Sequence, residues 1–225
     1  METEPGKLYG VVSGDVVGSS KLNKQARESL YNSLQRASSR LSDWLGEAMP
    51  LPVDVFGGDS WQLLLTTPEK SLAAALFYRA ALRSDTPGVD TRSAVAIGTV
   101  DFVPGDAVSA GDGPAFRLSG RLLSEGLGKR RLAFAAEDAQ TSDRWDLVFE
   151  RLDALVTSNW TAKRALAVAG ALRGWTQQTI GQQWEPAIDQ ATVNRHLKGA
   201  GWSAIARALA EFEQFWAVRG KSAGG

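Results

Sequence analysis

The segment from residue 53 to residue 65 constrains the fold of this chain more than any other. Two apolar runs, at residues 53–56 and 61–65, flank the sequence Gly57-Gly58-Asp59-Ser60. Glycines adopt the positive φ angles that tight turns require, so the segment predicts a β-hairpin and with it an antiparallel pair of strands. The rest of the sheet must be built around that pair.

Helices and strands alternate on both sides of the hairpin. The apolar run 8–13, which ends at Gly14-Asp15, predicts a first strand. Between Ser20 and Gly46 apolar residues recur at steps of three or four, which predicts a helix with one apolar face: Leu22, Ala26, Leu30, Leu34, Ala37, Leu41 and Leu45. Thr67-Pro68-Glu69 predicts the start of a second helix, with the threonine as its N-cap.

The remaining segments complete an α+β pattern. Residues 92–100 predict a strand, residues 114 to about 125 a helix, and residues 131–135 a last strand. The order strand, helix, hairpin, helix, strand, helix, strand predicts the ferredoxin-like architecture of palm domains, with an antiparallel-cored sheet and its helices on one face.

The composition changes near residue 150. Residues 151–225 hold five of the eight tryptophans and 9 Lys+Arg against 5 Asp+Glu, whereas residues 1–150 hold 16 against 20. We therefore expect one domain at residues 1–148 and an all-α domain at residues 149–225.

The residue types that are missing exclude several kinds of site. The chain has no cysteine and one histidine, His196, which excludes disulfides and thiolate zinc sites and disfavours a Ser-His-Asp triad. Any metal ion would need oxygen ligands, as Mg²⁺, Mn²⁺ and Ca²⁺ do. No apolar run approaches the roughly 18 residues of a membrane span, and the N-terminus lacks signal-peptide features, so we expect a cytoplasmic protein.

Two aspartates, Asp15 and Asp59, are the candidate metal ligands, because each follows a glycine at the end of a predicted strand. Neighbouring strands lie about 5 Å apart, and two carboxylates at about 4 Å repel by roughly 4 kcal/mol at an effective dielectric constant near 20. Mg²⁺ or Mn²⁺ would relieve that repulsion while sharing its other positions with phosphates. The alternative is that both aspartates only form turns.

The loop after Asp15 predicts a phosphate-binding segment. Its five residues are small or apolar and precede a predicted helix: Val16, Val17, Gly18, Ser19 and Ser20. Free backbone amides at such a position bind anions. Together with the two aspartates, the loop predicts a site for a metal ion and a nucleoside triphosphate.

Several of these segments resemble a known family. Residues 12–20 resemble the first metal motif of class III nucleotidyl cyclases, an aspartate followed by Ile-x-Gly-Ser-Thr. Residues 56–60 resemble the second metal motif of that family and also the hairpin turn of diguanylate cyclases. Residues 97–100 and 113–122 resemble the cyclase strand and its catalytic helix. Residues 58–62 are similar to a stretch of the SatD family, small bacterial proteins with a cyclase-like domain and a helix-turn-helix tail.

The resemblance covers roughly residues 8–135 and implies roles for single residues. Asp15 and Asp59 would be metal ligands, and Arg121 falls where the family keeps an arginine on the triphosphate. Arg117 replaces the asparagine that acts in the transition state, and Val55 replaces the lysine that reads the purine, although both arginines stay candidates for a catalytic role. These departures favour a nucleotide-binding regulatory protein, with an active nucleotidyl cyclase or nucleotidyltransferase as the alternative.

Two basic features have simpler interpretations. Arg117 and Arg121, four residues apart, would also fit an ordinary solvated helix face. The run Lys129-Arg130-Arg131 is typical of a solvated charge run, and a phosphate contact is the alternative.

The tail predicts two short helices, with Thr176 and Asp189 as caps. In the second helix Val193 and Leu197 would face inward. The outward positions carry side chains that bond to bases and phosphates: Gln190, Thr192, Asn194, Arg195 and Lys198. The pattern resembles the recognition helix of a helix-turn-helix, which predicts binding of double-stranded DNA as a homodimer, although the linker is about two residues longer than the usual turn. The alternative is a helical dimerisation or capping bundle.

Overall fold

The hairpin forms one edge of a five-stranded sheet in the computed structural model, which describes residues 1–222. The strands are β1 (Tyr9–Val16), β2 (Asp54–Phe56), β3 (Ser60–Leu65), β4 (Thr91–Gly98) and β5 (Leu132–Ala136). Their order is β2-β3-β1-β4-β5, antiparallel except for the parallel pair of β4 and β5. The first four strands and the helices between them follow the predicted ferredoxin-like connectivity, so the α+β class is confirmed.

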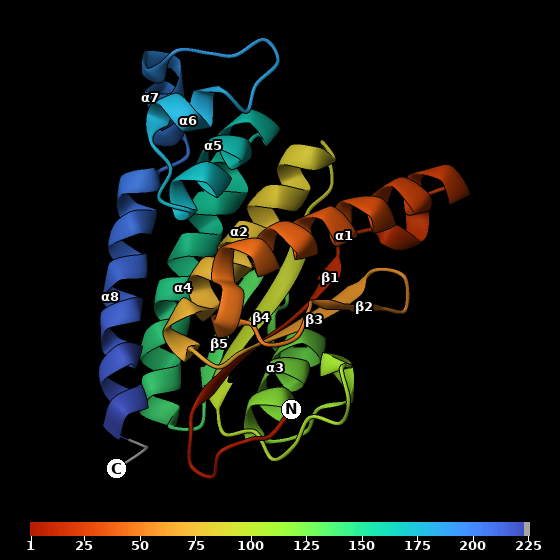
Figure 1. Ribbon diagram of the computed structural model, residues 1–225, viewed down its shortest axis with the longest axis vertical. Coiled ribbons are helices and arrows are strands. Elements are labelled where there is room, and N and C mark those ends of the chain that lie inside the picture. Colours follow the sequence, from red (N-terminus) through yellow and green to blue (C-terminus); the bar gives the residue numbers. More distant parts are fainter. Residues whose placement is uncertain (223–225) are drawn as a thin grey trace.

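Eight α-helices accompany the sheet among the described residues, and Figure 1 shows how they are arranged. Those of the body are α1 (Lys24–Leu45), α2 (Ser71–Asp85), α3 (Pro114–Arg121) and α4 (Ala139–Asn159). Those of the tail are α5 (Ala162–Leu172), α6 (Gln177–Gly181), α7 (Gln190–Gly199) and α8 (Trp202–Ser222). None of the helices within residues 1–222 combines the length and the apolar character that crossing a membrane requires.

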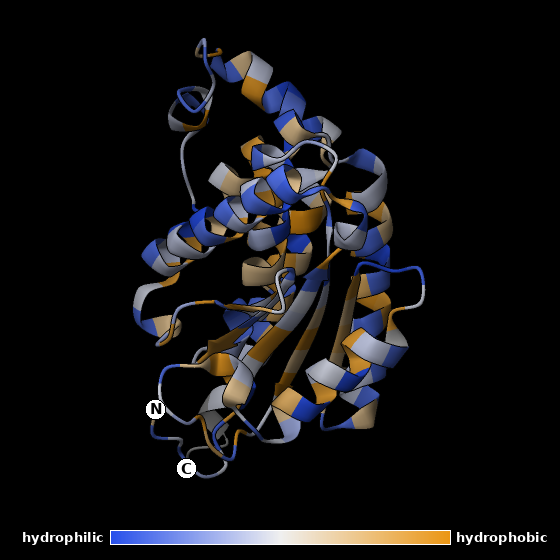
Figure 2. Ribbon diagram, turned by 90° about the vertical axis from the view of Figure 1, so that its right-hand side faces the viewer, coloured by the Kyte–Doolittle hydropathy of each residue, from blue (hydrophilic) through white to orange (hydrophobic). Residues whose placement is uncertain are grey.

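The sheet is covered on both faces, which corrects the prediction that its helices share one face. Val12, Leu63 and Val95 point into a large core that also takes buried residues of α1, α2 and α4. Tyr9 and Leu64, which alternate with them along the strands, pack instead with Phe116 of α3. Figure 2 shows hydrophobic residues running along the strands. The sheet is therefore the middle layer of three.

Several element boundaries differ from the predicted ones, among them those of β1, α1 and α2. Strand β1 continues through Asp15 to Val16, because Asp15 is paired with Ser60 on one side and with Arg92 on the other. Helix α1 begins after Asn23, whose side chain accepts a hydrogen bond from the Ala26 amide at 2.9 Å, and not at Ser20. Thr67 makes no capping hydrogen bond, because a short 3₁₀ turn (Pro68–Lys70) precedes α2. The first of these differences places Asp15 within the hydrogen-bonded ladder.

Gly14 allows β1 to pass close to the indole of Trp61. A Cβ atom at Gly14 would lie 2.3 Å from Cζ2 of Trp61 and 2.5 Å from the carbonyl oxygen of Arg92. We expect Gly14→Ala to lower the free energy of unfolding by roughly 1–3 kcal/mol through overpacking, as measured by urea denaturation. Gly120→Ala is the matched control, since a Cβ there meets nothing within 4 Å. Equal effects of the two substitutions would contradict the close approach at Gly14.

The tail shares its core with the body. Phe212 of α8 packs against Phe134 of β5 at 5.7 Å between ring centroids and against Trp145 of α4 at 5.0 Å. Figure 1 shows α8 lying along α4, with α5, α6 and α7 at one end of the molecule. The expected boundary between residues 148 and 149 falls inside α4, and residues 223–225 of the expected second domain lie outside the described residues.

Both predicted caps of the short tail helices are confirmed. The Thr176 hydroxyl accepts a hydrogen bond from the Thr179 amide at 3.1 Å, and the Asp189 carboxylate accepts one from the Thr192 amide at 2.6 Å. The connection between α6 and α7 covers residues 182–189, whereas the turn of a helix-turn-helix has about 3–4 residues. The two helices are thus further apart in sequence than that motif requires.

Candidate metal and triphosphate site

The sheet register brings Asp15 and Asp59 to the same edge. Asp15 lies directly opposite Ser60 in the ladder between β1 and β3, and Asp59 immediately precedes Ser60. The Val16 amide donates a hydrogen bond to the Asp59 carbonyl oxygen at 3.2 Å. The structure therefore places the two predicted metal ligands side by side, on β1 and on the turn before β3.

A third residue, Arg92, completes this edge. It is the direct partner of Asp15 on β4, and its Nε donates to Asp15 Oδ1 at 2.8 Å while a second guanidinium nitrogen bonds Oδ2. The hydrogen bond to Asp15 raises the pKa of Arg92, partial burial opposes the rise, and the charges of Asp15 and Asp59 add to it. Arg92 was not among the predicted site residues, although its place at the start of a predicted strand was a signal for it.

Asp59 has a weaker partner. Its Oδ2 accepts a hydrogen bond from the Ser19 hydroxyl, which is neutral. The side chains of Asp15 and Arg92 are 20% and 38% exposed, so the edge is within reach of solvent. The positive charge of Arg92 thus offsets the repulsion between the two carboxylates, a role that the sequence analysis had given to a metal ion.

The loop after Asp15 is anchored at its beginning and open at its end. The amides of Val16 and Val17 bond the carbonyl oxygens of Asp59 and Asp90, so these two of the five expected amides are already used. Gly18 turns the chain with φ 72° into a 3₁₀ turn (Ser19–Lys21). The amides of Gly18, Ser19 and Ser20 donate no backbone–backbone hydrogen bond among those of residues 1–222, and such a run of amides can bind an anion.

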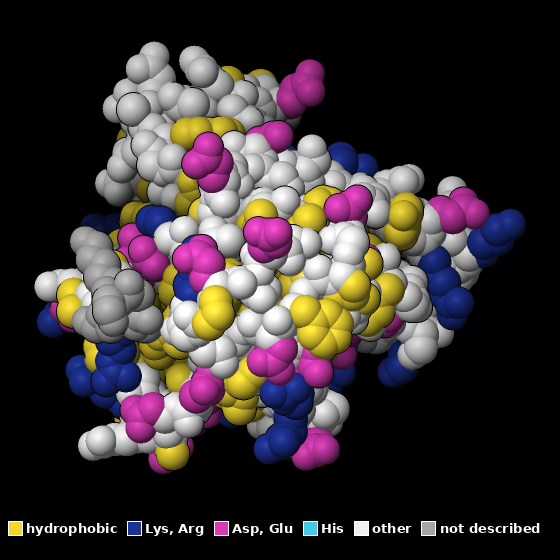
Figure 3. All heavy atoms as spheres, turned by 60° about the horizontal axis from the view of Figure 1, so that its bottom comes forward, with side chains coloured by type: hydrophobic (Ala, Val, Ile, Leu, Met, Phe, Trp, Pro, Cys, Tyr) yellow, Lys and Arg dark blue, Asp and Glu magenta, His cyan; other side chains and the backbone are white. Residues whose placement is uncertain are grey.

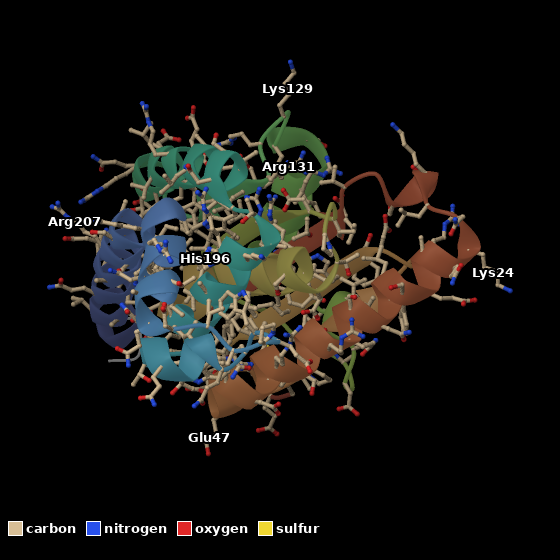
Figure 4. The ribbon with its side chains drawn as sticks, turned by 90° about the horizontal axis from the view of Figure 1, so that it is seen from above. Lys24, Glu47, Lys129, Arg131, His196 and Arg207 are labelled. Atoms are coloured by element: carbon tan, nitrogen blue, oxygen red, sulfur yellow. The ribbon has the colours of Figure 1, made fainter. Side chains whose placement is uncertain are left out.

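A cavity of about 450 Å³ lies between this loop and residues 128–131. One wall holds Asp15, Asp59, Arg92 and residues 16–20, and the other holds Gly128, Lys129, Arg130 and Arg131. Arg130 pairs with Asp146 at 2.9 Å and Arg131 with Asp90 at 3.4 Å. Figure 4 shows Lys129 at the tip of its loop, pointing away from the protein, and Arg131 nearer the body. The predicted solvated charge run therefore forms a wall of the cavity.

A second cavity, of about 770 Å³, adjoins the first. The two share Ser19, Ser20 and Asp59, and the second extends along the exposed face of α1 beside Tyr31. Volumes of roughly 300–1,000 Å³ are typical of small-molecule sites. The pair of cavities can thus accommodate a polyanionic group and an attached organic moiety.

Arg117 and Arg121 lie elsewhere. Both are exposed on α3, and neither lines the cavity at Asp15 and Asp59. Arg117 pairs with Asp112 at 2.7 Å and with Asp101 at 3.3 Å. At this end of the molecule acidic and basic side chains are interspersed (Figure 3). The structure does not bring the two arginines to the aspartate pair within one chain.

The exposed face of α7 follows the predicted pattern. Val193 and Leu197 are buried, as predicted. Gln190, Asn194, Arg195 and Lys198 are exposed, whereas Thr192 is half-buried and accepts a hydrogen bond from Arg195 at 2.7 Å.

His196 is a packed helix residue. Its ring stacks on Trp184 at 5.7 Å between centroids and 12° between planes. Burial lowers the pKa of His196, and the nearby positive charges of Lys163, Arg164 and Arg195 lower it further. The lowered pKa favours the neutral form of the ring, so His196 offers little positive charge to a phosphate.

The oxygen donors at the edge fit a metal ion that shares its coordination with a ligand. Among residues 1–222, no group of three or more His, Asp or Glu side chains could hold a metal ion. The donors present are the carboxylates of Asp15 and Asp59 and the Ser19 hydroxyl, which are hard oxygens. Mg²⁺ suits such a set, because it is usually bound by one or two carboxylates with waters and substrate phosphates. Arg92 bonds both oxygens of Asp15, so a metal ion would compete with it for that carboxylate.

Comparison with solved structures finds nucleotide cyclases. The adenylyl cyclase CyaB from P. aeruginosa shares 22% identity over 55% of this chain and 74% of that chain, with a TM-score of 0.40. The guanylyl cyclase Cya2 shares 14% identity over 55% and 72%, with a TM-score of 0.40. The catalytic core of a rhodopsin-guanylyl cyclase with converted specificity, in complex with ATPαS, shares 14% over 65% and 84%, with a TM-score of 0.43.

No protein-family model and no curated protein sequence matches the chain. The TM-scores to the similar solved structures lie below 0.5. The candidate site therefore rests on the residues and contacts described above.

Proposed function

We propose that the body binds a nucleoside triphosphate together with Mg²⁺ or Mn²⁺ ligated by Asp15 and Asp59. The observation that carries the proposal is the cavity, which joins two carboxylates to a basic wall at residues 129–131. The phosphates would lie between that wall and the amides of Gly18, Ser19 and Ser20. The bound metal ion would neutralise charge between the carboxylates and the phosphates.

Binding is better supported than turnover. Cyclisation needs a ribose hydroxyl aligned with the α-phosphate and groups that stabilise the developing charge. Arg117 is held by Asp101 and Asp112, and Arg121 does not line the cavity. We therefore infer a regulatory role in which the body senses a nucleotide, in a SatD-like arrangement of a cyclase-like domain and a DNA-binding tail. The aspartate pair keeps an active nucleotidyl cyclase or nucleotidyltransferase as the second candidate.

Calorimetric titration of each common nucleoside triphosphate tests the proposed function. We expect binding in Mg²⁺ or Mn²⁺ that disappears when a chelator removes the metal. Absence of binding for every triphosphate with either metal would contradict the proposal. The second candidate is tested in the same samples by pyrophosphate release. Pyrophosphate release by the wild type that is lost in Asp59→Ala would establish an enzyme. If no condition gives release, the enzyme is excluded and the nucleotide-binding regulatory protein is the candidate that stays.

We propose that the tail binds double-stranded DNA as a homodimer. The support is the outward face of α7, where Asn194, Arg195 and Lys198 surround the inward Val193 and Leu197. A single copy has a modest charge surplus, so two copies would raise the affinity, which must fall as salt screens the phosphates.

A salt series with DNA from upstream of the chain's own gene tests the tail. If Arg195 contacts a phosphate, Arg195→Ala should weaken binding and reduce the salt slope by about 1. Arg207→Ala is the matched control, because it removes an exposed arginine of α8 (Figure 4). Absent binding, or equal effects of the two substitutions, would contradict a role for α7.

A further inference from the structure

We propose that Arg92 is a positioning residue that reserves Asp15 for the metal–triphosphate complex, so that free metal and free triphosphate each bind weakly. The inference rests on the proposed function. Its starting point is that the guanidinium of Arg92 holds both carboxylate oxygens of Asp15.

The fold holds this ion pair firmly. Asp15 and Arg92 are direct cross-strand partners in the ladder between β1 and β4. Beside them the Thr91 hydroxyl donates to the Asp15 carbonyl oxygen at 2.6 Å and accepts from Trp61 Nε1 at 2.9 Å. The ladder and these hydrogen bonds hold the two backbones together, which keeps Arg92 within reach of Asp15.

A metal ion without a nucleotide must compete with this arginine. A metal ion on Asp15 would weaken the bonds of that carboxylate with Arg92, and a guanidinium that is released stays in the same cavity as the metal ion. Like charges repel, and a partly buried cation without a partner is unfavourable. The arginine and the metal ion thus compete at Asp15.

A triphosphate removes that obstacle only when it brings the metal ion. Phosphate oxygens would give the released guanidinium the bidentate partner that its planar geometry favours. A triphosphate alone would meet the negative charge of Asp59, whose partner is the neutral Ser19 hydroxyl. Each ligand therefore supplies the counter-charge that the other needs, and coupling between them must be reciprocal.

Titration of Mn²⁺, followed by the electron paramagnetic resonance of the free ion, tests the inference on the full-length protein. Without nucleotide, Arg92→Gln should bind Mn²⁺ roughly tenfold more tightly than the wild type, because the competing charge is gone. Adding a triphosphate should strengthen Mn²⁺ binding strongly in the wild type and much less in the variant. If Arg92 had only a structural role, the substitution Arg92→Gln would not raise the affinity for Mn²⁺.

Two further variants sharpen the test. Arg92→Lys keeps the charge and loses the second hydrogen bond, so its Mn²⁺ affinity should fall between those of the wild type and Arg92→Gln, and it can be used alone if the glutamine variant fails to fold. Arg36→Gln is the control, since Arg36 pairs with Asp85 at 3.3 Å away from the cavity, and it should bind Mn²⁺ as the wild type does.

The outcomes separate the two proposals. If the wild type binds the metal–triphosphate complex but Mn²⁺ alone binds no more tightly to either Arg92 variant, the role of Arg92 is overturned and the proposed function stands. If the wild type binds no metal–triphosphate complex, both fall.

Discussion

Replacing Arg79 by methionine is expected to lower the free energy of unfolding by about 3–5 kcal/mol. Arg79 of α2 is 1% exposed and donates to both oxygens of Asp90, at 2.8 and 2.9 Å, and to Asp153 at 2.8 Å. Methionine has a similar length but no charge, so two buried carboxylates would lose the cation between them. Urea denaturation at neutral pH measures the loss.

The pH dependence of this loss follows from Asp90. Burial alone would raise the pKa of Asp90, but its hydrogen bonds with Arg79 and the charges of Arg79, Arg83 and Arg131 lower it below the usual value of 3.8. A lowered pKa contributes stability above the unfolded-state value that is lost as pH falls through the folded-state value. Without Arg79 the pKa of Asp90 is higher than in the wild type, because only Arg83 and Arg131 then oppose the effect of burial, so the difference in stability between variant and wild type should narrow below about pH 4.

An exposed arginine provides the comparison. Arg36 is 56% exposed and pairs with Asp85 at 3.3 Å, so Arg36→Met should cost at most about 1 kcal/mol. A loss for Arg79→Met as small as the loss for Arg36→Met would show that the buried network does not hold α2 to α4.

The second large effect is expected at Asp59. Asp59→Asn should weaken metal-dependent triphosphate binding at least about 100-fold, which corresponds to about 2.7 kcal/mol. Asparagine keeps the shape of the side chain and an oxygen for the Ser19 hydroxyl, but it removes the negative charge that a hard cation requires. Calorimetric titration measures the binding, and thermal unfolding should show that the fold is retained.

Asp101→Asn is the matched control for Asp59→Asn. Asp101 is exposed, pairs with Arg117 at 3.3 Å and does not line the cavity. It should leave triphosphate binding unchanged. Binding that survives in Asp59→Asn, or that falls equally in both variants, would count against metal ligation by Asp59.

The order of elements could be predicted from the sequence because its signals are local. Gly57 and Gly58 have φ angles of 61° and 94°, as the predicted hairpin turn requires. The layer formed by α3 was not predicted, although the apolar residues of β1 indicate that a second layer covers the sheet. Tyr9 and Val11 are buried beneath α3, while Val12 faces the larger core. Such a continuous apolar run indicates a strand that is covered on both faces. It was used to predict the strand but not the second covered face.

The position of the site could be predicted, but its closest contacts could not. Asp15 and Asp59 were expected at one edge of the sheet because each lies at an end of a predicted strand, whereas their placement side by side follows from the register of β1 against β3. Arg92 faces Asp15 through the pairing of β1 with β4, and the register of distant strands is set by the packing of the whole sheet. Lys129 likewise reaches the cavity only because β5 adds beside β4.

In the tail, too, local features could be predicted and contacts between distant segments could not. The caps Thr176 and Asp189 could be predicted, since capping is decided within one helical turn. The abundance of tryptophan in the tail did not show where those side chains pack. Trp216 of α8 lies 5.9 Å from Phe134 of β5, between ring centroids, and so joins the core of the sheet.

Crystals grown with Mn²⁺ and a non-hydrolysable triphosphate test the central claim most directly. The anomalous signal of manganese should appear at about 2.1 Å, a typical distance for such a cation, from carboxylate oxygens of both Asp15 and Asp59. The phosphates should lie between the amides of Gly18, Ser19 and Ser20 and the wall at residues 129–131, with Arg92 bonded to phosphate. A triphosphate bound elsewhere, or bound here with no manganese and with Arg92 still on Asp15, would contradict the account.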